Sequence, residues 1–250
     1  MSDRAFIMQR PYFQSGQALV EYIYVFPILA LLILGAIQFG FIYQTKATLN
    51  YATFEATRNG ALNGGSMSSI VEGLTSGMMP LFAHSSSTGG ARNLDLLKNA
   101  WKLADAQMTD RKLTVITIVN PNSATLNAYA GQSESGNEIP NDNLMYRPTS
   151  IPGGTSMNIQ DANLLKVRVT YCYKMAVPIL NKMIYNLVVD PPATPVVGKT
   201  AADMLASDGG GSSSKPCTDI PEDEYRIPIT SESVVRMQSP FKDPGKWVGP

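Results

Sequence analysis

Histidine and cysteine, which build most metal and nucleophilic sites, are scarce in this 250-residue sequence: it has one histidine and two cysteines. His84 has no second candidate ligand near it in the sequence, and Cys172 and Cys217 lack the paired CxxC spacing of zinc and redox sites. The sequence also has no glycine-rich phosphate loop after a strand and no HExxH-type helix. We therefore expect no metal site and no cofactor, and we expect the protein not to be an enzyme.

Net charge is also missing, because twenty lysines and arginines are balanced by twenty aspartates and glutamates. A domain that binds nucleic acid through its phosphates carries an excess of basic residues, and this composition has none. We therefore expect no nucleic-acid partner. The length is sufficient for one soluble domain of ordinary size beside one membrane segment.

The sequence does contain one long apolar run. Residues 22–43 read YIYVFPILALLILGAIQFGFIY, with Gln38 as the polar interruption. As a helix this run would be about 33 Å long, which is enough to span a bilayer. A fully buried core helix and a cleaved signal sequence are the alternatives. A cleaved signal fits poorly, because the run is too long, follows a polar leader and precedes Gln44-Thr45-Lys46 instead of a small-residue cleavage site.

The basic residues around the apolar run indicate its orientation. Arg4 and Arg10 precede it, and Lys46 is the first basic residue after it. The positive-inside rule then places the amino terminus in the cytoplasm and the rest of the chain outside, which in a bacterium is the periplasm. In that compartment Cys172 and Cys217 can form a disulfide; two free thiols are the alternative.

A carboxylate stands at the start of the apolar run, where it needs a partner. Glu21 is the fifth residue after Gly16, and an acid at the rim of a membrane helix costs about 2–4 kcal/mol. If the chain is cut after Gly16, Gln17 becomes a positively charged amino terminus one helical turn from Glu21. The same carboxylate can instead neutralise the terminus of a neighbouring subunit, or it can simply face the lipid headgroups.

Pro27 lies inside the apolar run, six residues after Glu21. It removes one helical hydrogen bond and crowds the preceding turn, so we expect a kink or a local loosening of the helix there. Such a bend can help helices to pack in a filament; equally, proline is merely tolerated in membrane helices.

These residues together resemble a known family. Gly16, Glu21 and the long apolar helix resemble the prepilin-peptidase signature of type IV pilins and pseudopilins. A larger set resembles the amino-terminal region of TadE-like pseudopilins of the tight-adherence (Tad/Flp, type IVc) pilus system: Gly16–Tyr22, Pro27, Gln38–Gly40 and Tyr51–Ala61. Fainter similarity to the same group continues at residues 166–171 with Pro178, and at residues 235–240.

The resemblance implies a processed, membrane-anchored filament protein. A prepilin peptidase would cut between Gly16 and Gln17, and Glu21 and Pro27 would serve assembly. The implied partners are that peptidase, other pilins and pseudopilins, the inner-membrane assembly platform and the membrane itself. The chain length favours a minor pseudopilin, because major Flp-type pilins are far shorter. A major filament subunit and a signal-anchored periplasmic interaction module are the alternatives.

Helical patterns continue after the apolar run. The first helix is expected to extend to about Arg58, with Asn59-Gly60 as its stop and Thr45, Leu49, Ala52 and Ala56 on one face. Residues 64–90 read as a loose connection with a short helix over 67–74. Residues 91–108 predict an amphipathic helix with Trp101 facing the core; a partner-binding role for its apolar stripe is the alternative.

Alternating side chains predict strands in the second half of the chain. Residues 113–119 and 165–175 are rich in branched and aromatic side chains, and residues 226–237 also alternate. Residues 120–154 read as a long loop, and residues 178–189 as a short helix or strand. One buried and one wet sheet face indicate an antiparallel sheet covered by the amino-terminal helix. We thus predict an α+β chain: a leader (1–16), a transmembrane and amphipathic helix (17–60) and a small periplasmic domain (61–250).

Overall fold

The computed structural model describes residues 15–83, 93–132, 136–189, 217, 224–245 and 248–249. Most of the expected leader and His84 lie outside these residues. The helices are α1 (Ser15–Leu62), α2 (Met67–Phe82), α3 (Asn93–Met108), α4 (Ser123–Tyr129), α5 (Ile159–Ala162) and α6 (Leu180–Val188), with a 3-10 turn η1 (Ala130–Gln132). The strands are β1 (Thr114–Asn120), β2 (Glu138–Ile139), β3 (Leu164–Lys174), β4 (Arg226–Arg236), β5 (Phe241–Lys242) and β6 (Val248–Gly249).

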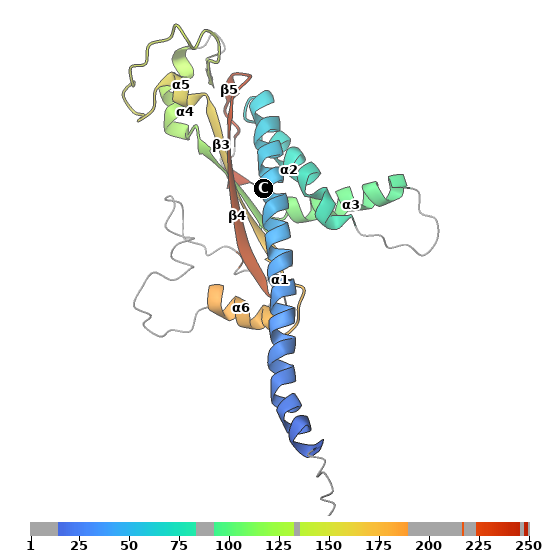
Figure 1. Cartoon of the computed structure of the whole chain (residues 1–250). Coiled ribbons are helices and arrows are strands. Elements are labelled where there is room, and N and C mark those ends of the chain that lie inside the picture. Colours follow the sequence, from blue (N-terminus) through green and yellow to red (C-terminus); the bar gives the residue numbers. More distant parts are fainter. Residues whose placement is uncertain are drawn as a thin grey trace, which may run out of the picture.

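The architecture is α+β, as predicted: one long apolar helix is followed by a small domain with an antiparallel sheet. The amino-terminal half of α1 projects away from the domain, while its carboxyl-terminal half lies across the sheet (Figure 1). The predicted face of that second half is confirmed, because Thr45, Leu49, Ala52 and Ala56 are all buried. A single helix thus connects an exposed apolar surface to a folded core.

The main sheet has four antiparallel strands in the order β4-β3-β1-β6. β3, one of its two inner strands, buries alternate side chains, Val167, Val169 and Tyr171, on the helix-covered face. On the opposite face Glu232 of β4 forms ion pairs with Lys166 and Arg168 of β3. One face of the sheet is therefore buried and the other faces solvent, as the alternation in the sequence predicts. A shift of one residue would exchange the two faces, so this pattern sets the strand register. A second, two-stranded sheet pairs β2 with β5.

Helix α2 packs antiparallel to the second half of α1, and two glycines allow the close approach. A Cβ atom added at Gly73 would lie 2.8 Å from Cα of Ala56, and one added at Gly77 would lie 2.4 Å from Cα of Ala52. Small residues four positions apart therefore face each other on both helices, which lets the two backbones touch. The sequence prediction of a helix over 67–74 is correct in position but too short, since α2 continues to Phe82.

The predicted helix stop at Asn59-Gly60 is wrong, because α1 continues to Leu62. The turn that ends it uses Gly64, whose φ is 66°, and the N–H of Gly65 donates to the carbonyl of Gly60 at 2.8 Å. The carboxyl-terminal segment satisfies two further groups at this helix end: the Ser239 hydroxyl donates to the carbonyl of Ala61 at 3.1 Å and accepts from the N–H of Gly64 at 2.8 Å. These hydrogen bonds join segments that are 175 or more positions apart in the chain.

The prediction that Trp101 faces the core is also wrong. Helix α3 buries Ala100, Ala104 and Met108, whereas Trp101 is 37% exposed. Trp101 instead lines a shallow surface groove together with Met67 and Val71 of α2. The physical reason is that α3 packs mainly on α2, and the small alanine face allows a closer approach than the face with the large side chains.

The segment 120–154, predicted as a long loop, holds short elements of its own. Asn122 caps α4 by accepting a hydrogen bond from the N–H of Thr125 at 2.8 Å, and β2 follows η1. The region 178–189 contains α6, which lies crosswise to α1 below the sheet (Figure 1). The described strands and the helices α2 to α5 lie on one side of α6 (Figure 1).

Candidate functional site

The start of α1 contains the residues that the sequence singles out for processing. Gly16 and Gln17 both lie in the first turn of α1, which begins at Ser15. Glu21 follows on the same helix with its side chain exposed. Four residues of an α-helix rise about 6 Å, so the backbone nitrogen of Gln17 is one turn away from Glu21.

The apolar run forms an exposed helical surface. Among the described residues, α1 is the one helix long and apolar enough to cross a membrane; its most apolar 18-residue stretch has a mean hydropathy of 2.4, and only 6% of that stretch is buried. A core helix of a soluble domain would be mostly buried, so this alternative is disfavoured. Helix α1 passes through Pro27 without interruption and curves only gently in its amino-terminal part (Figure 1).

Tyrosines lie near both ends of the exposed apolar surface, a feature that was not among the predictions from the sequence. Tyr22 and Tyr24 lie at the start, Tyr43 lies at the end, and all three are exposed. Tyrosine is enriched where a membrane helix enters and leaves the headgroup region, since its ring is apolar and its hydroxyl is polar. The signal was present in the sequence as the spacing between these tyrosines.

Gln38, the polar interruption of the apolar run, attaches the helix to the domain. Its side chain is fully buried, and its Oε1 accepts a hydrogen bond from the backbone N–H of Val177 at 2.9 Å. The two residues are 139 positions apart, so the sequence marks Gln38 as an unusual polar residue but does not reveal its partner. Burial raises the pKa of the nearby Tyr173 phenol, while hydrogen bonds with Gln38 and Thr45 act to lower it.

Lys46, the first basic residue after the apolar run, is turned into the domain. Its ammonium group donates to the backbone carbonyl of Thr230 on β4. Partial burial lowers the pKa of Lys46, and the nearby Glu232 carboxylate acts in the opposite direction. The amine thus connects α1 to the edge of the sheet.

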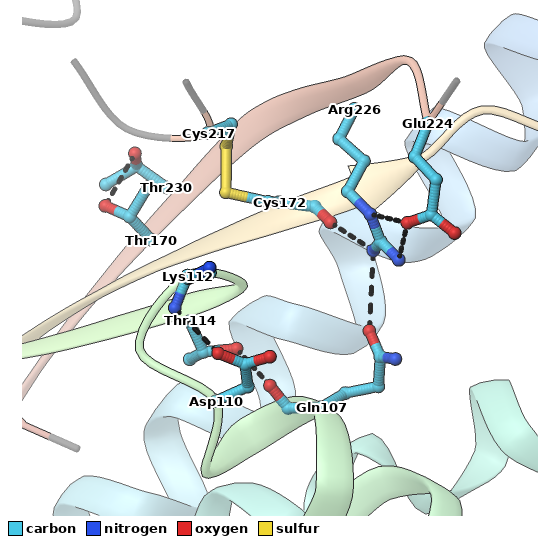
Figure 2. Close-up of a disulfide and its surroundings, with 10 residues drawn as sticks. All are labelled: Gln107, Asp110, Lys112, Thr114, Thr170, Cys172, Cys217, Glu224, Arg226 and Thr230. Atoms are coloured by element: carbon cyan, nitrogen blue, oxygen red, sulfur yellow. Dashed lines mark hydrogen bonds and ion pairs between the residues drawn. A yellow bond between two sulfur atoms is a disulfide. The ribbon is translucent and has the colours of Figure 1, made fainter. Parts of the chain in front are cut away.

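Cys172 of β3 and Cys217 are joined by a disulfide, with 5.7 Å between their Cα atoms. Figure 2 shows that the buried Arg226 lies beside it. The guanidinium of Arg226 donates to the Cys172 carbonyl at 2.9 Å and to Glu224 at 2.8 Å, and it reaches Gln107 of α3 at 3.4 Å. Hydrogen bonds from Lys174 and Arg226 hold the pKa of the Glu224 carboxyl below its ordinary value. The cluster joins α3, β3 and β4.

A groove of about 770 Å³ lies between α1 and the ends of α2, β3 and β4, lined in part by Phe41, Phe82, Tyr171, Tyr173 and Arg226. Burial raises the pKa of the Tyr171 phenol and that of the Tyr173 phenol. Within the described ranges, no three His, Cys, Asp or Glu side chains gather as metal ligands would.

Residues 16–58 match the sequence model of a family described as TadE-like protein. The amino-terminal helix is TadE-like. The match begins at the predicted cleavage residue Gly16 and covers both the exposed and the domain-packed parts of the helix. No curated protein and no solved structure matches the chain.

The TadE-like match ends at Arg58, shortly before α1 itself ends at Leu62. The matched segment therefore contains Gly16, Gln17, Glu21, Pro27 and Gln38, while the disulfide and the sheet lie outside it. A TadE-like helix associates the chain with tight-adherence pilus systems and with pilus proteins as partners in general.

Proposed function

We propose that this protein is a minor pseudopilin that takes part in assembling or initiating a Tad/Flp-type pilus. It crosses the bacterial inner membrane once, with its amino terminus in the cytoplasm and its domain in the periplasm. Its partners are a prepilin peptidase, other pilins and pseudopilins, and the inner-membrane assembly platform. It acts by association of helices and not by catalysis.

The observation that supports this proposal most strongly is the combination on α1 of an exposed apolar surface with Gly16 and Glu21 at its start. An anchor needs the apolar length alone. It does not need a glycine at the membrane edge followed, at the fifth position, by a carboxylate that costs about 2–4 kcal/mol at that edge. The TadE-like match over residues 16–58 supports the same interpretation.

In the proposed mechanism the peptidase cuts the bond between Gly16 and Gln17 and leaves a protonated amine on Gln17. This amine and Glu21 lie one helical turn apart, so they can neutralise each other within a subunit or between neighbouring subunits. Pairing of the two charges lowers the cost of moving the helix through the bilayer into a filament. The domain stays attached to the helix through Gln38 and the buried face beyond it.

Processing is tested by determining the amino terminus of the protein in cells that contain the matching peptidase. We expect the mature chain to start at Gln17. The variant Gly16→Leu should remain uncut, whereas Ser15→Ala, one residue upstream, should be cut normally. Recovery of only the full-length chain from wild-type cells would overturn the proposal.

Assembly is tested with Glu21→Gln, which removes the charge while keeping the shape of the side chain. We expect pilus formation to be lost while cleavage after Gly16, membrane insertion and the folded domain are retained. Glu72→Gln is the matched control, because Glu72 is an exposed carboxylate on α2, outside the apolar segment. If pili form normally with Glu21→Gln, the chain is better explained as a signal-anchored interaction module.

A further inference from the structure

Helix α6 has two apolar faces, and only one of them packs on the domain. Leu180 is buried, and Ile184, Tyr185 and Val188 contact the hydrophobic core. The ring of Tyr185 also meets the ring of Tyr225 at 5.6 Å between centroids. These contacts fix which way the helix is turned.

The opposite side of the same segment is apolar and exposed. Ile179, Met183 and Leu187 are 76%, 57% and 73% exposed, and they recur every four residues, which places them along one stripe. Lys182 and Asn186, both exposed, flank this stripe. We call Ile179, Met183 and Leu187 the outer stripe of α6.

The position of α6 along α1 is fixed by the contact with Gln38. The N–H of Val177 donates to the Gln38 side chain, and α6 begins three residues after Val177. Figure 1 shows α6 lying crosswise to α1, and among the described residues only α1 continues past α6 toward the amino terminus. If α1 crosses a bilayer, the axis of α6 is roughly parallel to the bilayer surface.

The depth of this contact follows from helix geometry. A hydrocarbon core of about 30 Å takes up about twenty helical residues, so a core that begins after Glu21 ends near Phe41. Gln38 lies five residues before Tyr43, which is about 8 Å deeper along the helix. The segment that contacts Gln38 is therefore level with the edge of the hydrocarbon and not above the headgroups.

We propose that α6 is an interfacial helix whose outer stripe inserts into the outer leaflet of the membrane that α1 crosses. The stripe belongs to a segment that lies level with the apolar part of α1, and Lys182 beside it suits phospholipid phosphate groups. The domain is thereby held against the bilayer at two places, the helix α1 and the helix α6. This inference rests on the membrane-spanning role proposed for α1.

The test uses the full-length chain in vesicles of phosphatidylethanolamine and phosphatidylglycerol. Single cysteines are introduced at exposed positions as Leu187→Cys, Ile33→Cys and Met145→Cys and labelled with a fluorophore in the absence of reductant, so that the bonded native cysteines do not react. Ile33 lies in the apolar run, and Met145 lies in the loop before α5, away from α6. Phospholipids brominated on their acyl chains then quench any label that enters the hydrocarbon.

We expect loss of fluorescence at positions 33 and 187 and no change at position 145. Quenching at 33 without quenching at 187 would overturn the interfacial role of α6 while leaving the membrane span intact. Absence of quenching at 33 would overturn the span, and with it the basis of this inference. A label at 187 that is shielded from aqueous iodide but unaffected by brominated lipid would show that protein, such as a second copy of this chain, covers the stripe instead.

Discussion

The side chain of Gln38 carries a polar contact between the apolar half of α1 and the domain. Gln38→Ala removes the acceptor of the Val177 N–H, which stays buried. An unsatisfied buried donor costs about 1–3 kcal/mol, so we expect the domain to be destabilised by this amount. The measurement is thermal unfolding of the full chain in detergent.

The matched control for this change is Ile37→Ala, because Ile37 is the neighbouring residue in the helix and its side chain is exposed. It should leave the unfolding temperature nearly unchanged, since this side chain is 46% exposed and lies outside the buried core cluster. Equal effects of the two substitutions would mean that the Gln38 hydrogen bond does not hold the domain to the helix.

Glu232 should give the domain a pH-dependent stability. Hydrogen bonds from Lys166, and then from Arg168, hold the pKa of the Glu232 carboxyl below its ordinary value. A lowered pKa in the folded state means that this stabilisation is present above the pKa of unfolded glutamate and is lost as the pH falls through the folded value. We therefore expect the loss to begin below about pH 4.5 and, because the ion pairs are partly exposed, to be no more than about 1 kcal/mol.

Unfolding of the wild type and of Glu232→Gln, compared from pH 7 to pH 3, measures this contribution. The difference in stability between them should shrink as the pH falls. Asp95→Asn is the control, because Asp95 is an exposed acid on α3. A difference that stays constant with pH would contradict the role of the Glu232 ion pairs.

At the scale of whole elements, the close contact between α1 and α2 depends on glycines of α2. In Gly77→Ala the added methyl group would lie 2.4 Å from Cα of Ala52, so the two helices must separate. Overpacking of this kind costs about 1–3 kcal/mol, and the better helix propensity of alanine offsets up to about 1 kcal/mol of it. We expect a net fall in the unfolding temperature, measured by circular dichroism.

Gly131→Ala is the control for this substitution, since nothing lies within 4 Å of a Cβ atom at that position. Its effect should be small. If Gly77→Ala is as stable as the wild type, α1 and α2 can accommodate the added methyl group, and the contact between small residues does not set the distance between the two helices.

The elements that the sequence predicts well are those with strong local periodicity. Strand β3 and the buried face of α1 follow directly from alternation and from helical spacing. The full length of α2 was not predicted, because its glycines and Pro80 lower helix propensity and their packing against α1 is a tertiary effect. The four-residue spacing of Gly73 and Gly77 was the feature of the sequence that could have indicated this close helix contact.

Features that depend on distant partners were not predictable in the same way. The Gln38–Val177 contact and the capping of α1 by Ser239 join segments far apart in the chain, and no local pattern encodes either. Trp101 is a case in which a local pattern misleads. It belongs to an apolar helical stripe, but it is exposed because α3 packs through its alanines. For the candidate site, the sequence pointed to Gly16 and Glu21 but not to the attachment of their helix to the domain.

At the scale of the whole molecule, the carboxyl-terminal segment closes the domain onto α1. Phe241 is fully buried and lies against Gly65, and the N–H of Lys242 donates to the carbonyl of Gly64 at 2.9 Å. Strand β6 then pairs with β1 at the other edge of the sheet from β4. This carboxyl-terminal segment thus contacts both the turn that ends α1 and the sheet that packs on this helix.

The disulfide adds a covalent constraint to this unit. Cys172 and Cys217 are 45 residues apart, and closing a loop of this size in the unfolded chain corresponds to a stabilisation of about 4 kcal/mol in the chain-entropy model. We expect the double variant Cys172→Ser with Cys217→Ser to unfold at a clearly lower temperature than the wild type, and reductant to lower the wild type to the same level. Reductant should not affect the double variant; if it does, the loss has a cause other than this bond.

Because disulfides persist in oxidising compartments, alkylation of native protein in cells also tests the proposed orientation. Protected cysteines agree with a periplasmic domain, and two freely alkylated thiols would contradict it.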